Sequence, residues 1–244
     1  MRNFEFKQFT RRHRPHVQPP GATFFVTYRL AGSIPKCVVN DYEERRKLLE
    51  NELRLAERAA NTSEQRTPRR EQLERFQRQW FAKFEMILHQ SAYGPTWMKD
   101  DRVAKIVADG VRELDGKDYR LDCYCIMSNH VHIVFKPFVT EANLLEVLNF
   151  GQRPSFFSPY PGLPAIMKTL KGRSARKANI LLERTGRFWE HESFDHVVRA
   201  GRLQRTVNYV LNNPVKAGIA KRWQDWPWTY CRKEVYDALN AKQV

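Results

Sequence analysis

Four segments of the chain carry the residue pattern of β-strands. Residues 22–30 place apolar side chains at every second position, which predicts a first strand with two different faces. β-Branched and aromatic residues are dense in residues 119–127 and again in 130–137, and the short polar step between them predicts a hairpin. Residues 187–199, also rich in aromatic and β-branched side chains, predict a fourth strand.

Apolar residues recur at spacings of three and four between these strands, and this period predicts helices. The helices are expected at residues 40–60, 67–90, 103–114, 165–183 and 201–213. A capping box at residues 40–43 predicts the start of the first helix, and Thr67 and Pro68 predict the start of the second. These two helices predict a hairpin inserted between the first two strands. It either packs on the core or projects as a nucleic-acid clamp, and its mixed charge favours packing.

The elements follow the order strand, helices, strand, strand, helix, strand, helix. A βαββαβ order predicts an α+β, ferredoxin-like fold, with an antiparallel sheet and helices on one face. We expect one domain over residues 22–230, with the helical insertion at about residues 40–90. A basic, proline-interrupted arm at residues 1–21 would precede it, and a tail at residues 231–244 would follow. Residues 223–230, which are rich in tryptophan, predict a hydrophobic strap over the core.

The net charge of the chain indicates what kind of partner it binds. Its 244 residues include 42 Lys and Arg but only 27 Asp and Glu, giving a net charge of +15 and favouring polyanions, nucleic acid first, over neutral ligands. Aromatic residues beside such cations suit unpaired bases better than a duplex. No apolar run approaches membrane-spanning length and no signal sequence opens the chain, so we expect a cytoplasmic, nucleoid-associated protein without a membrane partner.

The four cysteines, at positions 37, 123, 125 and 231, have no Cys-x-x-Cys spacing. Cys123 and Cys125 are expected on one apolar strand face with Leu121 and Met127, where free cysteine behaves as a small buried hydrophobe. The cysteines are therefore expected to be chemically inert.

The helix at residues 165–183 has charges of nearly one sign, unlike the inserted hairpin. Its basic side chains are Lys168, Lys171, Arg173, Arg176 and Lys177. This density of positive charge makes the helix the best candidate for contacts with a phosphate backbone.

Two histidines in the third strand carry the most specific chemistry. His130 and His132 share one face of the strand, because side chains alternate with period two, while Val131, Ile133 and Phe135 point to the other. The apolar face can be buried and the histidine face left open. Two neutral imidazoles side by side predict a cation site that needs a third ligand from elsewhere in the chain.

The last helix offers that ligand. Its apolar stripe leaves Tyr209 roughly 145° and Asn213 roughly 105° from the stripe centre, so neither points at the core. Four residues apart, they are neighbours on the helix surface. The amide oxygen of Asn213 is a plausible third ligand, and the phenol of Tyr209 a plausible nucleophile near a cation. A surface tyrosine and an ordinary helix-terminal asparagine before Pro214 explain the same pattern.

Several motifs together resemble one family. Residues 129–132 read Asn-His-Val-His, and residues 209–218 read Tyr-Val-Leu-Asn-Asn-Pro-Val-Lys-Ala-Gly. The further matching segments are Thr-Tyr-Arg-Leu-Ala-Gly-Ser at 27–33, Leu-Lys-Gly at 170–172, Phe-Trp-Glu-His-Glu-Ser-Phe-Asp-His at 188–196 and Asp-Trp-Pro-Trp at 225–228. In this order they are similar to the REP-associated tyrosine transposases, a branch of the single-tyrosine HUH transposases. Ser128, where relatives commonly have proline, and the long helical insertion depart from that pattern.

The resemblance implies an enzyme that cleaves and rejoins single-stranded DNA beside hairpins of repetitive extragenic palindromic elements. It implies a metal held by His130, His132 and Asn213, and attack by Tyr209 that leaves a 5′-phosphotyrosine and a free 3′-hydroxyl. The implied ion is Mg²⁺ or Mn²⁺, although ligand softness alone favours a softer one.

Two other readings stay open at the level of the sequence. The same fold could bind structured nucleic acid without catalysis, or a metal-activated water could hydrolyse the substrate without a covalent adduct. Neither the hairpin sequence nor the choice between monomer and homodimer follows from the sequence.

Overall fold

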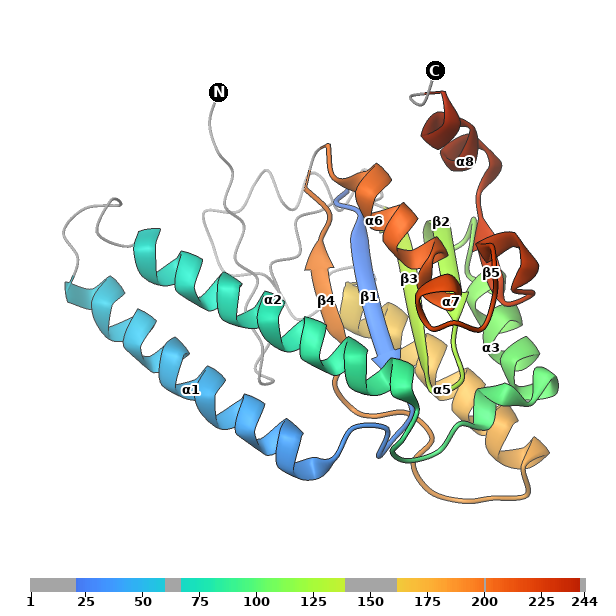
Figure 1. Cartoon of the computed structure of the whole chain (residues 1–244), viewed down its shortest axis with the longest axis horizontal. Coiled ribbons are helices and arrows are strands. Elements are labelled where there is room, and N and C mark those ends of the chain that lie inside the picture. Colours follow the sequence, from blue (N-terminus) through green and yellow to red (C-terminus); the bar gives the residue numbers. More distant parts are fainter. Residues whose placement is uncertain (1–20, 60–66, 139–161, 200, 242–244) are drawn as a thin grey trace. The chain divides into compact units, whose positions relative to one another are not determined.

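The computed structural model describes residues 21–59, 67–138, 162–199 and 201–241 (Figure 1). All of the predicted arm except Gly21 lies outside these residues. So do residues 144–148, an apolar cluster that predicts a short helix or turn, and most of residues 152–164, whose prolines predict a loop. The chain divides into two compact units. One runs from Leu30 to Thr96, and the other combines Met1–Arg29 with Trp97–Val244.

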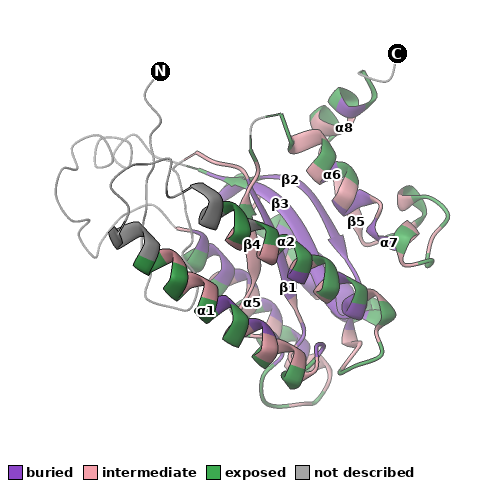
Figure 2. Ribbon diagram, turned by 60° about the vertical axis from the view of Figure 1, so that its left-hand side comes forward, coloured by how far each residue is buried: buried purple, intermediate pink, exposed green. Residues whose placement is uncertain are grey.

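The larger unit is built on a five-stranded sheet in which every paired strand is antiparallel. The strands are β1 (Phe24–Arg29), β2 (Tyr119–Ile126), β3 (His130–Pro137), β4 (Phe194–Val197) and β5 (Thr229–Cys231), in the spatial order β4-β1-β3-β2-β5. The first four strands have the order 4-1-3-2, which is the ferredoxin-like arrangement, so the predicted fold class is confirmed. Figure 2 shows the central strands almost wholly buried.

Two helices cover one face of this sheet, as expected for a ferredoxin-like fold. They are α3 (Asp101–Glu113) and α5 (Leu163–Leu181). The Tyr119 hydroxyl donates to the carbonyl of Val111 in α3 at 2.7 Å. Tyr28 of β1 contacts Trp189 edge to face, and the Trp189 indole donates to Ser174 of α5 at 3.0 Å. Tyr28 therefore marks the face of the sheet that carries α5.

A third helix lies on the opposite face (Figure 1). Helix α6 (Leu203–Leu211) buries Val207 and Val210, and its Tyr209 contacts Phe25, which alternates with Tyr28 along β1. The helix predicted over residues 201–213 ends at Leu211, and Asn213, expected as its last residue, instead begins α7 (Asn213–Lys216), where proline suits the first turn of a new helix. Helix α8 (Lys233–Asn240) and the 3₁₀ turns η2 (Trp97–Lys99) and η3 (Trp223–Asp225) complete the part of this unit that the structure describes.

The segment predicted as a hydrophobic strap forms a sheet edge instead. After η3, β5 pairs with β2, and the amide of Ile126 donates to the carbonyl of Trp228 at 2.9 Å. The predicted fourth strand is also shorter than expected. Phe188 and Trp189 are buried ahead of β4, and Trp189 forms only an isolated β-bridge, so the strand begins at Phe194.

A β-bulge in β2 separates Leu121 from the predicted cysteine face, whereas Cys125 and Met127 stay together, with their sulfur atoms 3.6 Å apart. The register with β3 shifts between Leu121 and Cys123, so these residues lie on opposite faces, and Cys123 and Cys125 share the face of His132. Asp122 stands at the shift, fully buried, with an oxygen 3.0 Å from the guanidinium of Arg120. Burial raises the pKa of its carboxyl, and Arg120 opposes that rise.

The smaller unit is the predicted helical hairpin, formed by α1 (Lys36–Ala59) and α2 (Thr67–Gln90). Helix α1 begins at Lys36, ahead of the predicted capping box, because the amides of Val38 and Val39 already donate to the carbonyl of Pro35. Tyr42 stacks on Phe76 and contacts Trp80 and Phe84 of α2, so aromatic side chains join the two helices.

Candidate active site

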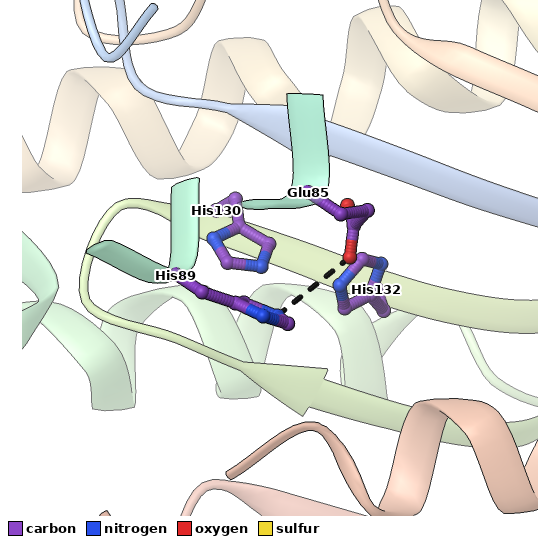
Figure 3. A group of neighbouring side chains, drawn as sticks. All are labelled: Glu85, His89, His130 and His132. Atoms are coloured by element: carbon purple, nitrogen blue, oxygen red, sulfur yellow. Dashed lines mark ion pairs between the residues drawn. The ribbon is translucent and has the colours of Figure 1, made fainter. Parts of the chain in front are cut away.

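The two histidines of β3 lie side by side on the face of the sheet opposite α5. Their ring centroids are 4.8 Å apart, and their ligand nitrogens lie within 4.8 Å of each other (Figure 3). The sequence predicted an open histidine face, but both side chains are fully buried. Within this unit, the ring of Tyr209 from α6 lies against His132, so the helix covers the face that the strand pattern left polar.

Each imidazole is oriented through its Nδ1 atom. Thr27, the register partner of His132 across β1 and β3, places its hydroxyl 2.7 Å from His132 Nδ1. The carboxamide oxygen of Asn129 lies 2.7 Å from His130 Nδ1. An amide oxygen only accepts, so Nδ1 of His130 is the donor in this contact and carries a proton. Both contacts point to Nε2 as the cation-binding atom, the arrangement usual for histidine metal ligands.

Tyr209 stands next to this pair. Its ring meets His132 edge to face at a centroid distance of 5.8 Å, and Phe25 at 5.9 Å. The side chain is half-buried, in contrast to the fully buried histidines. The ammonium of Lys216 lies 4.3 Å from the centroid of the Tyr209 ring. The phenol is thus flanked by an imidazole and an ammonium.

Asn213 is the first residue of α7 and is fully buried. Its side-chain amide nitrogen donates to the backbone carbonyl of Tyr209 at 3.1 Å. This bond orients the amide group, so the remaining carbonyl oxygen is the atom that a cation would use. The structure therefore links Asn213 to Tyr209 through the backbone and links Tyr209 to His132 through ring contact.

Another polar group on the same sheet face, Arg29, was given no role by the sequence. Arg29 is the register partner of His130, so the two side chains are cross-strand neighbours. Its guanidinium lies 3.4 Å from a carboxylate oxygen of Glu190, whose backbone amide donates to the carbonyl of Arg29 at 2.8 Å. The alternation of side chains along β1 predicts that Thr27 and Arg29 share one face. Which residues they lie opposite is known only from the register of β1 and β3.

The five basic residues of α5 have different surroundings. The Lys171 ammonium donates to the carbonyls of Glu190 and His191 at 3.0 Å each, and Arg173 pairs with Glu113 at 2.9 Å. Arg173 is nevertheless exposed, as are Lys168, Arg176 and Lys177, for which no ion pair is found among the described residues. Because α5 packs on the face marked by Tyr28, this basic surface lies across the sheet from the histidines.

The helical hairpin holds a further pair of ligand types that the sequence reading missed. Glu85 and His89 are one turn apart on α2, with His89 Nε2 and a Glu85 carboxylate oxygen 3.7 Å apart, drawn as the dashed line in Figure 3. Their i, i+4 spacing could have indicated that they are neighbours, but this segment was interpreted only from the spacing of its apolar residues.

Comparison with known proteins identifies no family by sequence. No protein-family model and no curated protein matches the chain. One solved structure that it resembles is that of a REP-associated tyrosine transposase bound to a REP hairpin, at 11% identity and a TM-score of 0.45, covering 96% of this chain and 88% of that one. A TM-score this low, at this identity, establishes neither family nor activity. Among the described helices, none has the length and apolar character needed to cross a membrane.

Proposed function

We propose that this chain is a metal-dependent endonuclease and strand transferase of single-stranded DNA, acting at hairpins of repetitive extragenic palindromic elements. The observation that carries the proposal is the contact of the Tyr209 ring with His132, beside a second imidazole, on one face of the sheet. A half-buried phenol next to two oriented imidazoles is the arrangement that a tyrosine nucleophile near a cation requires. The net charge of +15 supports a polyanionic substrate.

The donor set fits a divalent cation. His130 and His132 each hold Nδ1 in a hydrogen bond and direct Nε2 to a cation, and Asn213 adds a carbonyl oxygen. These three residues would hold Mg²⁺ or Mn²⁺, as the family resemblance implies. When bound, the ion would polarise a phosphoryl oxygen and make the phosphorus more electrophilic.

The residues of the chain then perform the transfer. The Tyr209 oxygen attacks the phosphorus and forms a new O–P bond, while the bond from phosphorus to the 3′ oxygen breaks. The phenol loses its proton, and the departing 3′ oxygen gains one as a hydroxyl. A phenol with an ordinary pKa near 10 is mostly protonated at neutral pH, so the attack depends on stabilising the charge that develops on the phosphoryl group.

The decisive experiment compares the unmutated protein with Tyr209→Phe on hairpin-containing single-stranded DNA with Mg²⁺ or Mn²⁺. Cleavage and a denaturation-resistant protein–DNA adduct should disappear together, because the variant loses only the attacking oxygen. Tyr93→Phe, which changes an exposed tyrosine in the hairpin unit, is the matched control and should retain both.

Other outcomes contradict the proposal in identifiable ways. Cleavage by Tyr209→Phe without an adduct indicates a hydrolase that uses activated water. DNA binding with no cleavage by the unmutated protein indicates a binding module. An adduct that survives in Tyr209→Phe places the nucleophile at another tyrosine.

A further inference from the structure

We propose that Lys216 binds the phosphate group that Tyr209 attacks and stabilises the charge on its oxygens during the transfer. This inference rests on the proposed function and adds a catalytic residue outside the predicted metal and nucleophile set. It follows from the position of one ammonium group relative to one phenol.

The local backbone holds Lys216 against Tyr209. The two residues are seven positions apart, and Asn213 lies between them, so all three fall on one side of the chain as α6 gives way to α7. The amide of Lys216 donates to the carbonyl of Asn212 at 3.0 Å, and the amide of Ala217 donates to that of Asn213 at 3.0 Å. These bonds fix the Lys216 backbone, and its Nζ reaches 4.3 Å from the Tyr209 ring centroid.

The charge of Lys216 is available to a ligand. Its side chain is exposed, and among the described residues it makes no ion pair with a carboxylate. Arg222, in contrast, pairs with Asp225 at 2.8 Å. Helix α7 itself contains no acidic residue. An ammonium next to a half-buried phenol, uncompensated by a carboxylate, is therefore a ready anion-binding group.

The chemistry assigns a specific task to this ammonium. Negative charge lies on the non-bridging phosphate oxygens, and a cation placed beside them stabilises the transition state of phosphoryl transfer. His132 meets the Tyr209 ring on the sheet side, whereas Lys216 is exposed to solvent, the side from which DNA must approach. Lysine is flexible enough for its terminal bonds to turn from the ring to a phosphate bonded to the phenol oxygen.

The first test measures binding without cleavage. In a Tyr209→Phe background, which keeps an aromatic ring, Lys216→Gln should reduce the log–log salt slope for hairpin-containing single-stranded DNA by about 0.7, the value for one phosphate contact. Lys221→Gln removes an exposed lysine of the same charge nearby and should leave the slope unchanged. An unchanged slope in Lys216→Gln would overturn the proposal, whether or not the protein cuts DNA.

The second test separates phosphate binding from packing against the ring. With Tyr209 intact, Lys216→Gln should slow single-turnover cleavage about 100-fold, the usual effect of removing one preorganised donor, and Lys216→Arg should restore most of the rate. On DNA with a neutral methylphosphonate at the scissile position, the Lys216→Gln penalty should largely disappear. A penalty of equal size on that DNA would show that Lys216 only supports the ring, which refutes the proposal.

The first test is independent of the proposed function, whereas the second requires cleavage. Absence of the adduct from the unmutated protein refutes the strand-transfer reaction, yet the salt slope still decides whether Lys216 contacts a phosphate. A lost phosphate contact with an intact cleavage rate would place Lys216 on a phosphate remote from the reaction and would also refute the inference.

Discussion

Single side chains decide the chemistry of the sheet face that carries His130 and His132. Thr27 and Asn129 bind no substrate in the proposed reaction, yet each holds one imidazole through Nδ1. Neighbours of this kind orient metal-binding histidines and raise their basicity. The cation affinity of the site should therefore depend on residues that are not ligands.

We predict that Thr27→Val weakens Mn²⁺ binding about 10- to 100-fold, because valine keeps the shape of threonine but loses the hydroxyl at His132. Titration calorimetry with Mn²⁺ measures this without DNA. Thr23→Val, just before β1, is the control and should bind Mn²⁺ normally. Normal Mn²⁺ affinity in Thr27→Val would argue that His132 does not bind the ion through Nε2.

At the scale of elements, the hairpin unit depends on a close approach of two glycines at the positions where its chain begins and ends. Gly94 has a φ of +67°, and a Cβ there would lie 2.3 Å from the carbonyl oxygen of Gly32, which has a φ of +80°. Glycine alone has the freedom and the size for this contact.

Gly94→Ala should therefore destabilise the protein by at least about 2 kcal/mol, since it adds backbone strain to a steric clash. Gly110→Ala is the matched substitution. Gly110 lies inside α3, and a Cβ added there would meet nothing within 4 Å. The Gly110→Ala variant should therefore be more stable by about 0.5–1 kcal/mol. Urea unfolding followed by circular dichroism measures both. Equal stability of the two variants would contradict the tight approach.

Periodicity located most elements, because a period of 2 or 3.6 reports which face of a segment is buried. The order of strands then gave the fold, since few topologies accommodate βαββαβ. Periodicity could not reveal the bulge at Asp122, where one extra residue exchanges the faces of β2. It also could not reveal the burial of His132, because the covering side chain comes from α6, remote in sequence.

The sequence predicted part of the candidate site, as it predicted part of the fold. His130, His132, Tyr209 and Asn213 stood out by spacing and by family resemblance, and the structure brings them to one region of the larger unit. Thr27, Arg29 and Lys216 fall within the segments that carry the resemblance, but the sequence alone assigned none of them a role. Their significance arises from the β1–β3 register and from the break between α6 and α7, which are tertiary features.

At the scale of the whole molecule, the excess of positive charge is divided between paired and exposed side chains. Lys171 and Arg173 of α5 are engaged with Glu190, His191 and Glu113. The exposed Lys168, Arg176 and Lys177 remain for phosphates. Because α5 lies across the sheet from the histidines, DNA bound there would contact the protein at a distance from the reacting phosphate.

We therefore predict that converting Lys168, Arg176 and Lys177 together to glutamine lowers the log–log salt slope of binding to hairpin-containing single-stranded DNA by about 2, from three contacts of about 0.7 each. The single-turnover cleavage rate at saturating DNA should change little, because none of the three lies on the histidine face. Lys171→Gln with Arg173→Gln is the control. It removes two positive charges that already bond to Glu190, His191 and Glu113, so it should keep the slope. The prediction is wrong if the double variant lowers the slope and the triple variant does not. In that case DNA contacts the side of α5 that carries Lys171 and Arg173.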